Sequence, residues 1–191
     1  NNTNIEDEAL TEGYYLTDAI SDNAVKYINN HKDENDNPFF MYVAYTSPHW
    51  PLHAFKEDIE KYKGRFDKGW DKLREERMKK MVELGLIDSK WKITPRDESQ
   101  PSWKNATQKK WQARRMEVYA AQIDRMDQGI GRIVESLEDT GMYDDTLIIF
   151  LADNGGCAEE LIPPGLELLK EHLTKEFTKK GKKVSIGNDP S

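Results

Sequence analysis

Two stretches of this chain join an apolar run to side chains that can take part in chemistry. Asp153 and Asn154 directly follow one apolar run, and two glycines come after them. His49 and His53 lie in a proline-broken loop that follows a second apolar run. Carboxylate and amide oxygens are hard donors that suit Ca²⁺ or Mg²⁺. Imidazole transfers protons or contacts anions near neutral pH.

Both groups of residues also have an ordinary structural interpretation. Asp-Asn-Gly-Gly is a common composition for a turn at the end of a strand, because Asn, Asp and Gly dominate turns. A histidine in a loop between prolines is often a packing or surface residue. The residue types alone therefore leave two interpretations open for each group, a functional site or a structural loop.

Two strands are expected to position these residues. The segments 39–45 and 146–152 are continuous apolar runs without polar alternation, which is typical of strands that are covered on both faces. Each such strand needs neighbouring strands, and this chain does not obviously contain them. Ligands of open parallel sheets bind outside the carboxyl ends of the strands. If the two strands are parallel, the histidines and the Asp-Asn pair share one edge of the sheet.

Helical patterns surround the two strands. Amphipathic spacing predicts a helix over 17–32 and a long helix over 107–139, which Gly141 is well placed to end. The apolar seam of the long helix consists of Met116, Tyr119, Ala120, Ile123, Met126, Ile130, Ile133, Val134 and Leu137. The charged region 56–86 predicts one short and one longer helix. Strands that alternate with helices predict an α/β fold with a mainly parallel sheet flanked by helices.

Composition excludes several classes of protein. The chain has 191 residues, of which 37% are hydrophobic and 33% are charged. This composition is polar for a compact α/β domain. It suggests that the chain has long exposed helices or is part of a larger protein. The net charge of −7 argues against a general nucleic-acid binder. A single cysteine, Cys157, excludes an internal disulfide. No stretch is long and uncharged enough for a membrane span, and the N-terminus has no signal-peptide pattern. Residues 1–13 are polar and expected to be loose.

Three stretches together resemble one known family. They are "PFFMYVAYTSPHWPLHA", "ARRMEVYAAQIDRMDQGIGRIVESL" and "TLIIFLADNGGCAE". These stretches resemble the arylsulfatase-type sulfatases of the alkaline-phosphatase-like superfamily, and the resemblance extends over about residues 14–191 in the same order. It implies a three-layer sandwich with a mainly parallel sheet. It also implies hydrolysis of sulfate esters with one divalent cation, usually Ca²⁺ with Mg²⁺ as the alternative, in a periplasmic or secreted parent protein.

The resemblance assigns roles to individual residues. Asp153 and Asn154 match the late Asp-Asn pair of metal ligands in that family. His49 matches the histidine of a Pro-His-x-Pro stretch that contacts the sulfate and assists the leaving-group oxygen. His53 has no equally firm counterpart and is expected to contact the substrate. Relatives that act on phosphate carry Asp-His at the Asp-Asn position, so Asn154 favours the one-cation sulfatases.

The chain also departs from the family pattern. The family nucleophile is a formylglycine made from Cys or Ser in a C/S-x-P-S/A-R motif. Cys157 does not begin such a motif, and the stretch 99–103, "SQPSW", has Trp103 where the motif needs arginine. The early Asp pair of the metal site and the downstream lysine that contacts sulfate are also missing. Residues 1–191 are therefore expected to be an internal segment of one catalytic domain, inactive alone, with the formylglycine outside it.

The expected substrate is a sulfated small molecule or a sulfated glycan, and the sequence does not choose between them. Two alternatives remain. The first is a phosphate or phosphonate ester hydrolase of the same superfamily. The second is a non-catalytic interaction module on the same fold. Loss of neighbouring strands would also leave exposed sheet edges, so self-association of this segment is expected.

Overall fold

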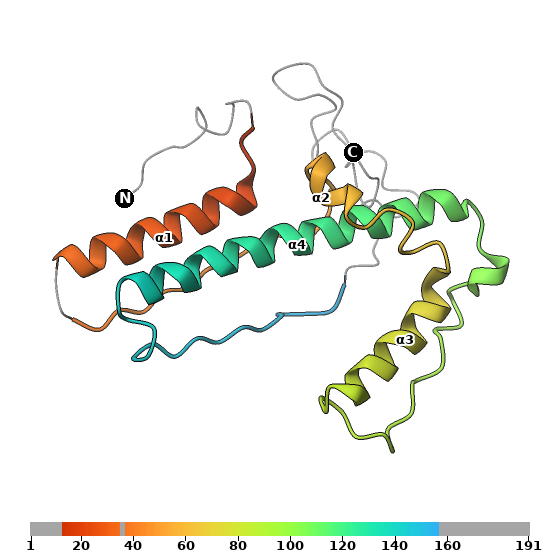
Figure 1. Cartoon of the computed structure of the whole chain (residues 1–191). Helices are drawn as coiled ribbons and strands as arrows, with labels where there is room; N and C mark the ends of the chain where they lie inside the picture. The colour runs from red at the N-terminus through yellow and green to blue at the C-terminus, as the bar shows by residue number, and fades with distance from the viewer. Residues whose placement is uncertain (1–12, 35–36, 157–191) are drawn as a thin grey trace, which may run out of the picture.

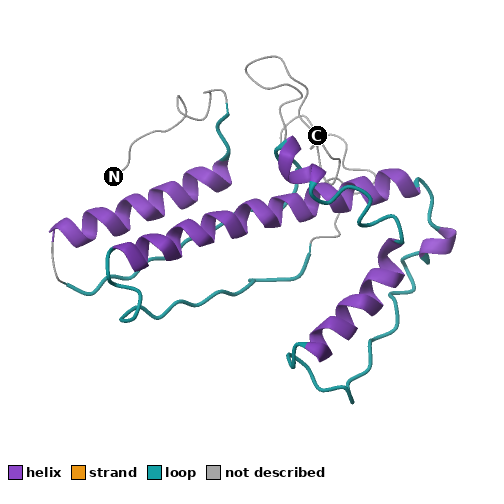
Figure 2. Cartoon of the chain, viewed as in Figure 1, coloured by secondary structure: helices purple, strands orange, loops and turns teal. Residues whose placement is uncertain are grey.

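The structure is a computed structural model that describes residues 13–34 and 37–156. Its elements are α1 (Leu16–Glu34), α2 (Lys56–Glu60), α3 (Gly69–Glu83), the 3-10 helix η2 (Trp103–Asn105) and α4 (Lys109–Asp139) (Figure 1). Within these ranges the chain forms helices and loops but no β-strand (Figure 2). The N-terminal residues 1–12 and Cys157 lie outside the described residues. No helix in the described ranges has the length and apolar character that a membrane crossing requires.

The long helix α4 is the central element, and α1 and α2 both pack against it (Figure 1). Its bounds confirm the helix predicted over 107–139. Gly141, with φ of 72°, follows the C-terminal Thr140, as predicted for the residue that ends the helix. Much of the predicted seam, including Tyr119, Ile123 and Ile130, lines a cavity beside α4. The helix therefore uses two neighbouring faces, one for α1 and one for this cavity.

The contact between α1 and α4 depends on Gly129. A Cβ atom at this position would overlap Oγ of Ser21, which is fully buried on α1. The Ser21 hydroxyl donates to the Thr17 carbonyl oxygen at 3.0 Å and shares a hydrogen bond of 2.8 Å with the Tyr45 hydroxyl. The missing side chain thus allows one serine to join α1, α4 and the segment that contains Tyr45.

The charged region 56–86 forms α2 and α3, which confirms one short and one longer helix. Ile59 of α2 is buried with Leu52, Val118 and Ala121, and this apolar cluster attaches α2 to α4. The longer helix α3 extends away from α1 and α4 (Figure 1). It packs against η2, where the rings of Trp70 and Trp103 meet edge to face at 4.7 Å. This arm lies apart from the predicted site.

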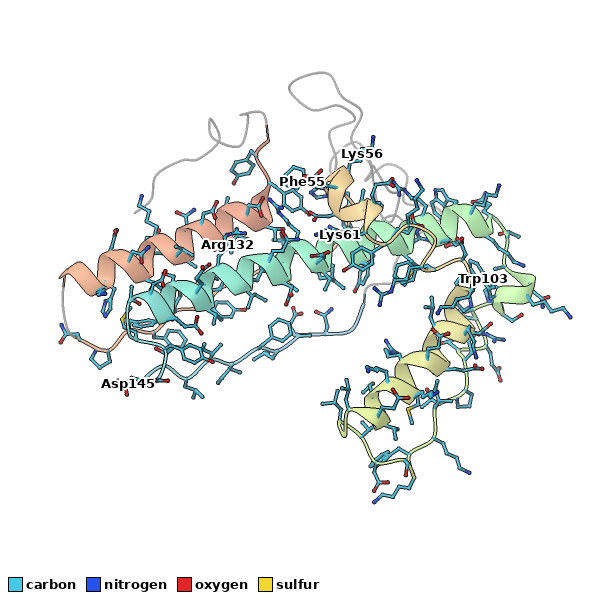
Figure 3. The ribbon with its side chains drawn as sticks, in the orientation of Figure 1. Phe55, Lys56, Lys61, Trp103, Arg132 and Asp145 are labelled. Atoms are coloured by element: carbon cyan, nitrogen blue, oxygen red, sulfur yellow. The ribbon has the colours of Figure 1, made fainter. Side chains whose placement is uncertain are left out.

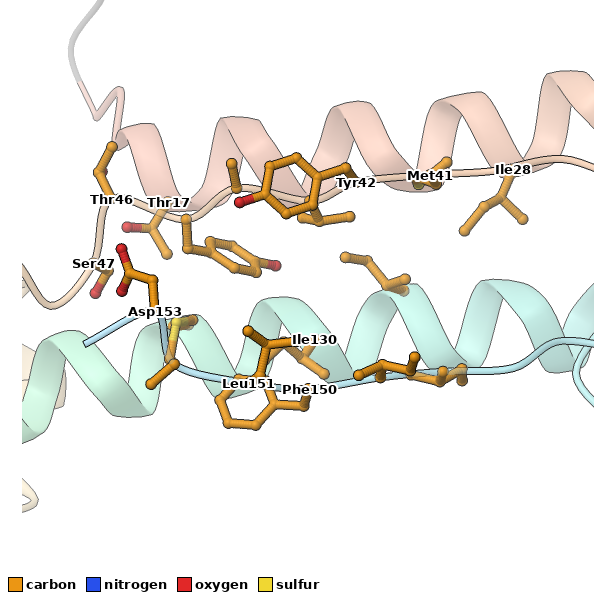
Figure 4. A pocket seen from close by; sticks show the side chains of 18 of the residues that line it. Thr17, Ile28, Met41, Tyr42, Thr46, Ser47, Ile130, Phe150, Leu151 and Asp153 are labelled. Atoms are coloured by element: carbon orange, nitrogen blue, oxygen red, sulfur yellow. The ribbon is translucent and has the colours of Figure 1, made fainter. Parts of the chain in front are cut away.

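The predicted strands 39–45 and 146–152 are extended and run in the same direction across one side of α1 and α4 (Figures 1 and 4). No strand ladder forms within the described residues, so the parallel sheet remains a prediction. Among the described residues neither segment is covered on both faces, as expected where the neighbouring strands are missing. Phe40 and Leu147 are 92% and 85% exposed, because each segment contacts the helices on one side only. Along 39–45 the exposure alternates, and the odd-numbered residues are the half-buried ones.

Two apolar extended segments with an open side should promote association of the 191-residue chain. We expect self-association or an aggregation-prone monomer, because unpaired N–H and C=O groups and exposed apolar side chains favour pairing with another copy. Sedimentation at several concentrations, combined with a denaturant melt, measures this. Phe150→Lys should reduce association, whereas Tyr27→Lys, at an exposed position on α1, should not. A monodisperse monomer with a steep unfolding transition would contradict this prediction.

The role of Gly129 is testable with a matched glycine on the same helix. Gly129→Ala should lower the free energy of unfolding by about 1–3 kcal/mol, because the new methyl group displaces a buried, hydrogen-bonded serine. Gly131 has no atom within 4 Å of an added Cβ. Gly131→Ala should therefore be neutral or raise stability by up to about 1 kcal/mol, since alanine has the higher helix propensity. Denaturant melts of both variants measure the difference, and equal effects would show that Gly129 is not a packing constraint.

Candidate active site

All four predicted site residues line one cavity. Its volume is about 2000 Å³, and it lies between the two extended segments and the adjoining faces of α1 and α4. His49, His53, Asp153 and Asn154 contribute to its lining from two parts of the sequence that are about 100 residues apart. The structure therefore brings both groups of candidate residues to the same cavity.

The first group lies in residues 46–55, called the site loop below. This loop is fixed to α4 at Ser47, whose hydroxyl donates to the backbone carbonyl oxygen of Gln122 at 3.0 Å. Leu52 is buried in the apolar cluster beneath α2. The backbone of the loop is thus attached at two points, while the rings of His49 and His53 are exposed.

Hydrogen bonds within the loop set the tautomers of both histidines. Nδ1 of His49 lies 2.8 Å from the Trp50 carbonyl oxygen, and Nδ1 of His53 lies 2.7 Å from the Pro51 carbonyl oxygen. A carbonyl oxygen can only accept, so each Nδ1 carries the proton and donates it. Nε2 of each ring then remains as the nitrogen for contact or proton transfer with a ligand.

Tyr15 supports His53 from the start of α1. Its hydroxyl donates to the His53 carbonyl oxygen at 3.0 Å, and the two rings meet edge to face with centroids 5.3 Å apart. Burial raises the pKa of the Tyr15 hydroxyl above its usual value, so the group stays protonated as a donor near neutral pH. Tyr15 thus fixes the backbone of the site loop at the residue next to its apolar anchor.

The second group lies at the end of the extended segment 147–152. The side chain of Asp153 points toward the beginning of the site loop, where Thr46 and Ser47 lie (Figure 4). Nδ2 of Asn154 donates to the Gly155 carbonyl oxygen at 2.7 Å. This bond occupies the amide nitrogen, so Oδ1 is the atom that could bind a cation.

The donor atoms fit a hard cation in kind but not in number. Asp153 and Asn154 offer carboxylate and amide oxygens, which suit Ca²⁺ or Mg²⁺, whereas Ca²⁺ takes about 6–8 oxygen ligands. In the described part of the chain, no three His, Cys, Asp or Glu side chains are grouped so as to bind a metal. The described residues can therefore supply part of a cation site.

Sequence reasoning missed the residues that fix the site loop. Tyr15 stands just after a polar N-terminal stretch, and nothing in the sequence marks its bond to a residue 38 positions away. Ser47 precedes the Pro-His pair, but its partner Gln122 is 75 residues further on. The only signal in the sequence was that Ser47 lies at the end of a predicted strand; nothing marked Tyr15. Long-range pairs of this kind need the packing of α1 and α4 to be known.

Comparison with known proteins identifies the family. The profile described as Sulfatase matches residues 1–186. An uncharacterized sulfatase of Schizosaccharomyces pombe is 37% identical over 162 residues, which cover 82% of this chain and 29% of that protein. An arylsulfatase of Klebsiella aerogenes is 34% identical over 149 residues, which cover 77% of this chain and 32% of that protein. The chain belongs to the sulfatase family, which confirms the resemblance found in the sequence.

The chain spans about a third of the length of these two relatives. Among solved structures, it is similar to Ps i-CgsB, crystallised in complex with k-i-k-neocarrahexaose, with 24% identity and a TM-score of 0.41. That match covers 71% of this chain and 20% of the other chain. The family assignment therefore rests on the sequence.

Asp153 and Asn154 should bind a divalent cation only weakly in the 191-residue chain. Two protein oxygens are far fewer than Ca²⁺ requires, so calorimetric titration with CaCl₂ should show no binding tighter than about millimolar. The double variant Asp153→Ala/Asn154→Ala should abolish even that heat. Micromolar binding by the unaltered chain would mean that further residues complete the site, and the assignment of missing ligands would be wrong.

Proposed function

We propose that the whole protein containing this chain hydrolyses sulfate esters and that this chain supplies the His49 side of the active site and part of its cation site. One observation carries the proposal: in a chain of the sulfatase family, His49 and the Asp153–Asn154 pair line the same cavity. A polar edge with a proton-transfer group and hard oxygen donors suits an anionic ester.

Asp153 and Asn154 are the residues that would bind the cation. An amide beside a carboxylate favours Ca²⁺ or Mg²⁺ over zinc, which prefers imidazole and thiolate ligands. A bound cation offsets negative charge that gathers on the sulfate oxygens as the ester bond breaks. The orientation of the Asp153 side chain toward Ser47 supports a sulfate position between the second extended segment and the site loop.

His49 is proposed to serve the leaving-group oxygen. Its Nδ1 proton is engaged with the Trp50 carbonyl oxygen, which leaves Nε2 to stabilise or protonate the departing oxygen when the ring is charged. The exposed ring lies on a loop whose backbone is fixed, so the group can reach substrate without losing its position. His53 lines the same cavity and is proposed as a substrate contact.

The nucleophile is proposed to lie outside this chain, as a formylglycine. Ser99 of the partial motif "SQPSW" does not line the cavity, and its hydroxyl donates to Asp97 at 2.7 Å. Trp103, at the position where the motif needs arginine, packs against Trp70 in the α3 arm. This placement agrees with the sequence-based prediction that the stretch is not the nucleophile.

The substrate class follows from the same chemistry. We propose a sulfated small molecule or a sulfated glycan, and a periplasmic or secreted location for the parent protein. A cation and a histidine would recognise the sulfate group itself, which both kinds of substrate carry. The 191-residue chain alone is proposed to be inactive.

His49→Ala in the whole protein should lower turnover of an aryl sulfate such as 4-nitrophenyl sulfate by about 10²–10⁴-fold, the usual effect of removing a general acid or base. Metal content should stay unchanged, because His49 is not proposed as a ligand. His31→Ala is the matched control, since this histidine borders the same cavity at the C-terminal end of α1, away from the site loop, and should leave turnover unchanged.

Two results would count against this function. Unchanged turnover in His49→Ala would remove this residue from the mechanism. Faster hydrolysis of 4-nitrophenyl phosphate than of the sulfate by the unaltered protein would favour the phosphate or phosphonate ester hydrolase instead.

A further inference from the structure

We propose that Arg125, bound between Asp18 and Asp58, is a positioning residue that fixes the site loop and so places His49 and His53. The three residues come from α4, α1 and α2 and are called the carboxylate–arginine cluster below. The inference about loop position stands on the structure alone. Its consequence for turnover rests on the proposed sulfatase function.

Arg125 and Asp18 form a two-point contact between α4 and α1. Nε and Nη2 of Arg125 donate to the two carboxylate oxygens of Asp18 at 2.8 Å and 2.7 Å. Such paired bonds fix the plane of the guanidinium group as well as its position. Both side chains are partly buried, so solvent weakens this pair less than it weakens an exposed one.

Asp58 adds a buried charge to the cluster. The residue is 2% exposed, and its Oδ1 accepts from Lys61 Nζ at 2.8 Å and from Gln128 Nε2 at 3.2 Å. Its Oδ2 is buried without a hydrogen-bond partner among the described residues, and Nη1 of Arg125 lies 3.7 Å away. A buried carboxylate needs a compensating cation. Arg125 therefore contributes to keeping Asp58, and the start of α2, in place.

The cluster reaches the site loop through two aromatic rings. The guanidinium carbon of Arg125 lies 4.8 Å from the ring centroid of Phe55, the last residue of the loop. The Phe55 ring lies 5.1 Å from the Tyr15 ring, and the Tyr15 hydroxyl donates to the His53 carbonyl oxygen. Figure 3 shows Phe55 beside α2, at the junction with α1 and α4. A continuous series of contacts thus links Arg125 to His53.

Other contacts can maintain the fold when Arg125 is replaced. The apolar cluster of Leu52, Ile59 and Val118 attaches α2 to α4 independently. The contact at Gly129 joins α1 to α4 one turn further along. Loss of Arg125 is therefore expected to move the end of the site loop rather than to unfold the chain. Arginine suits this place because a lysine cannot form the paired bonds and stack on Phe55 with one planar group.

The chain offers a matched control in Arg132. This residue lies on the same helix and pairs with Asp22 of α1 at 3.2 Å and with Asp18 at 3.8 Å, but no contact joins it to Phe55 or Asp58. Figure 3 shows it between α1 and α4. Arg132→Met also removes an interhelical contact between arginine and aspartate, one that is more exposed and made through a single nitrogen. It separates a general loss of α1–α4 pairing from a specific effect on the site loop.

The first test is made on the 191-residue chain, without reference to activity. The ring C–H protons of His53 lie beside the Tyr15 ring, so their NMR chemical shifts depend on where that ring sits. These shifts should change in Arg125→Met, because Phe55 loses its contact with the guanidinium group and Tyr15 packs against Phe55. They should stay unchanged in Arg132→Met. Unchanged His53 signals in a folded Arg125→Met chain would overturn the inference. If that variant does not fold, Phe55→Leu interrupts the same series without exposing Asp58, and the same outcomes apply.

The second test is made on the whole protein with 4-nitrophenyl sulfate. Arg125→Met should lower kcat by about 10²-fold, the effect expected when a catalytic group is misplaced by about 1 Å, with a smaller change in KM. Arg125→Lys should recover part of this loss, and Arg132→Met should remain near the unaltered value. Unaltered kcat in Arg125→Met beside a large loss in His49→Ala would overturn the positioning role and leave the proposed function intact. No turnover by the unaltered protein would overturn the proposed function, and the His53 signals would still decide the loop inference.

Discussion

The close approach of α1 and α4 at Gly129 is the constraint on which the rest of the structure depends. Because this residue lacks a side chain, Ser21 fits against α4 and still makes its hydrogen bonds to Thr17 and Tyr45. Tyr45 is the last residue of the first extended segment, so the helix contact also determines where that segment ends. The site loop begins at the next residue, and Ser47 attaches it to α4. Helix packing and the placement of His49 are therefore consequences of the same local geometry.

The many charges of this chain have unequal effects on its structure. Pairs such as Lys63–Glu60 and Lys72–Glu75 lie within single helices or turns and are exposed, and such pairs contribute about 0–1 kcal/mol at most. The carboxylate–arginine cluster differs because Asp58 is buried and because its members come from three helices. Removal of Arg125 would leave the buried Asp58 with Lys61 as its remaining cationic partner. Among the many charged residues, the carboxylate–arginine cluster thus connects the helices to the site loop through its geometry rather than through its charge alone.

The sequence predicted the helices well because their signal is local. The three-to-four-residue spacing of apolar residues in 107–139 and the glycine after it gave the position of α4 closely. It also predicted strands at 39–45 and 146–152, with the candidate residues at one edge if the two strands are parallel. It did not predict their burial in this chain, since burial of a strand depends on neighbours rather than on its own residues. Arg125 was missed because Asp18 lies 107 residues away, and each was an ordinary charge on a helix.

The size and lining of the cavity bear on where the proposed sulfate chemistry would occur within it. A volume of about 2000 Å³ exceeds the roughly 300–1000 Å³ of usual ligand pockets. Its middle is lined by apolar side chains such as Val43, Ile130 and Ile149, which offer nothing to an anion. The polar candidates Ser47, His49 and Asp153 line one end, where the extended segments finish, and other polar residues, His31, Lys32 and Asp145, line the cavity near the C-terminal end of α1 and the start of the second segment. The proposed cation and histidine contacts of an anionic ester belong to the end where Asp153 and the site loop lie, while the apolar length of the cavity suits the neighbouring strands that both extended segments require. The proposed site and the open side of the two segments thus border different parts of one cavity, and the short stretch where the segments end is the part to which the proposed chemistry is assigned.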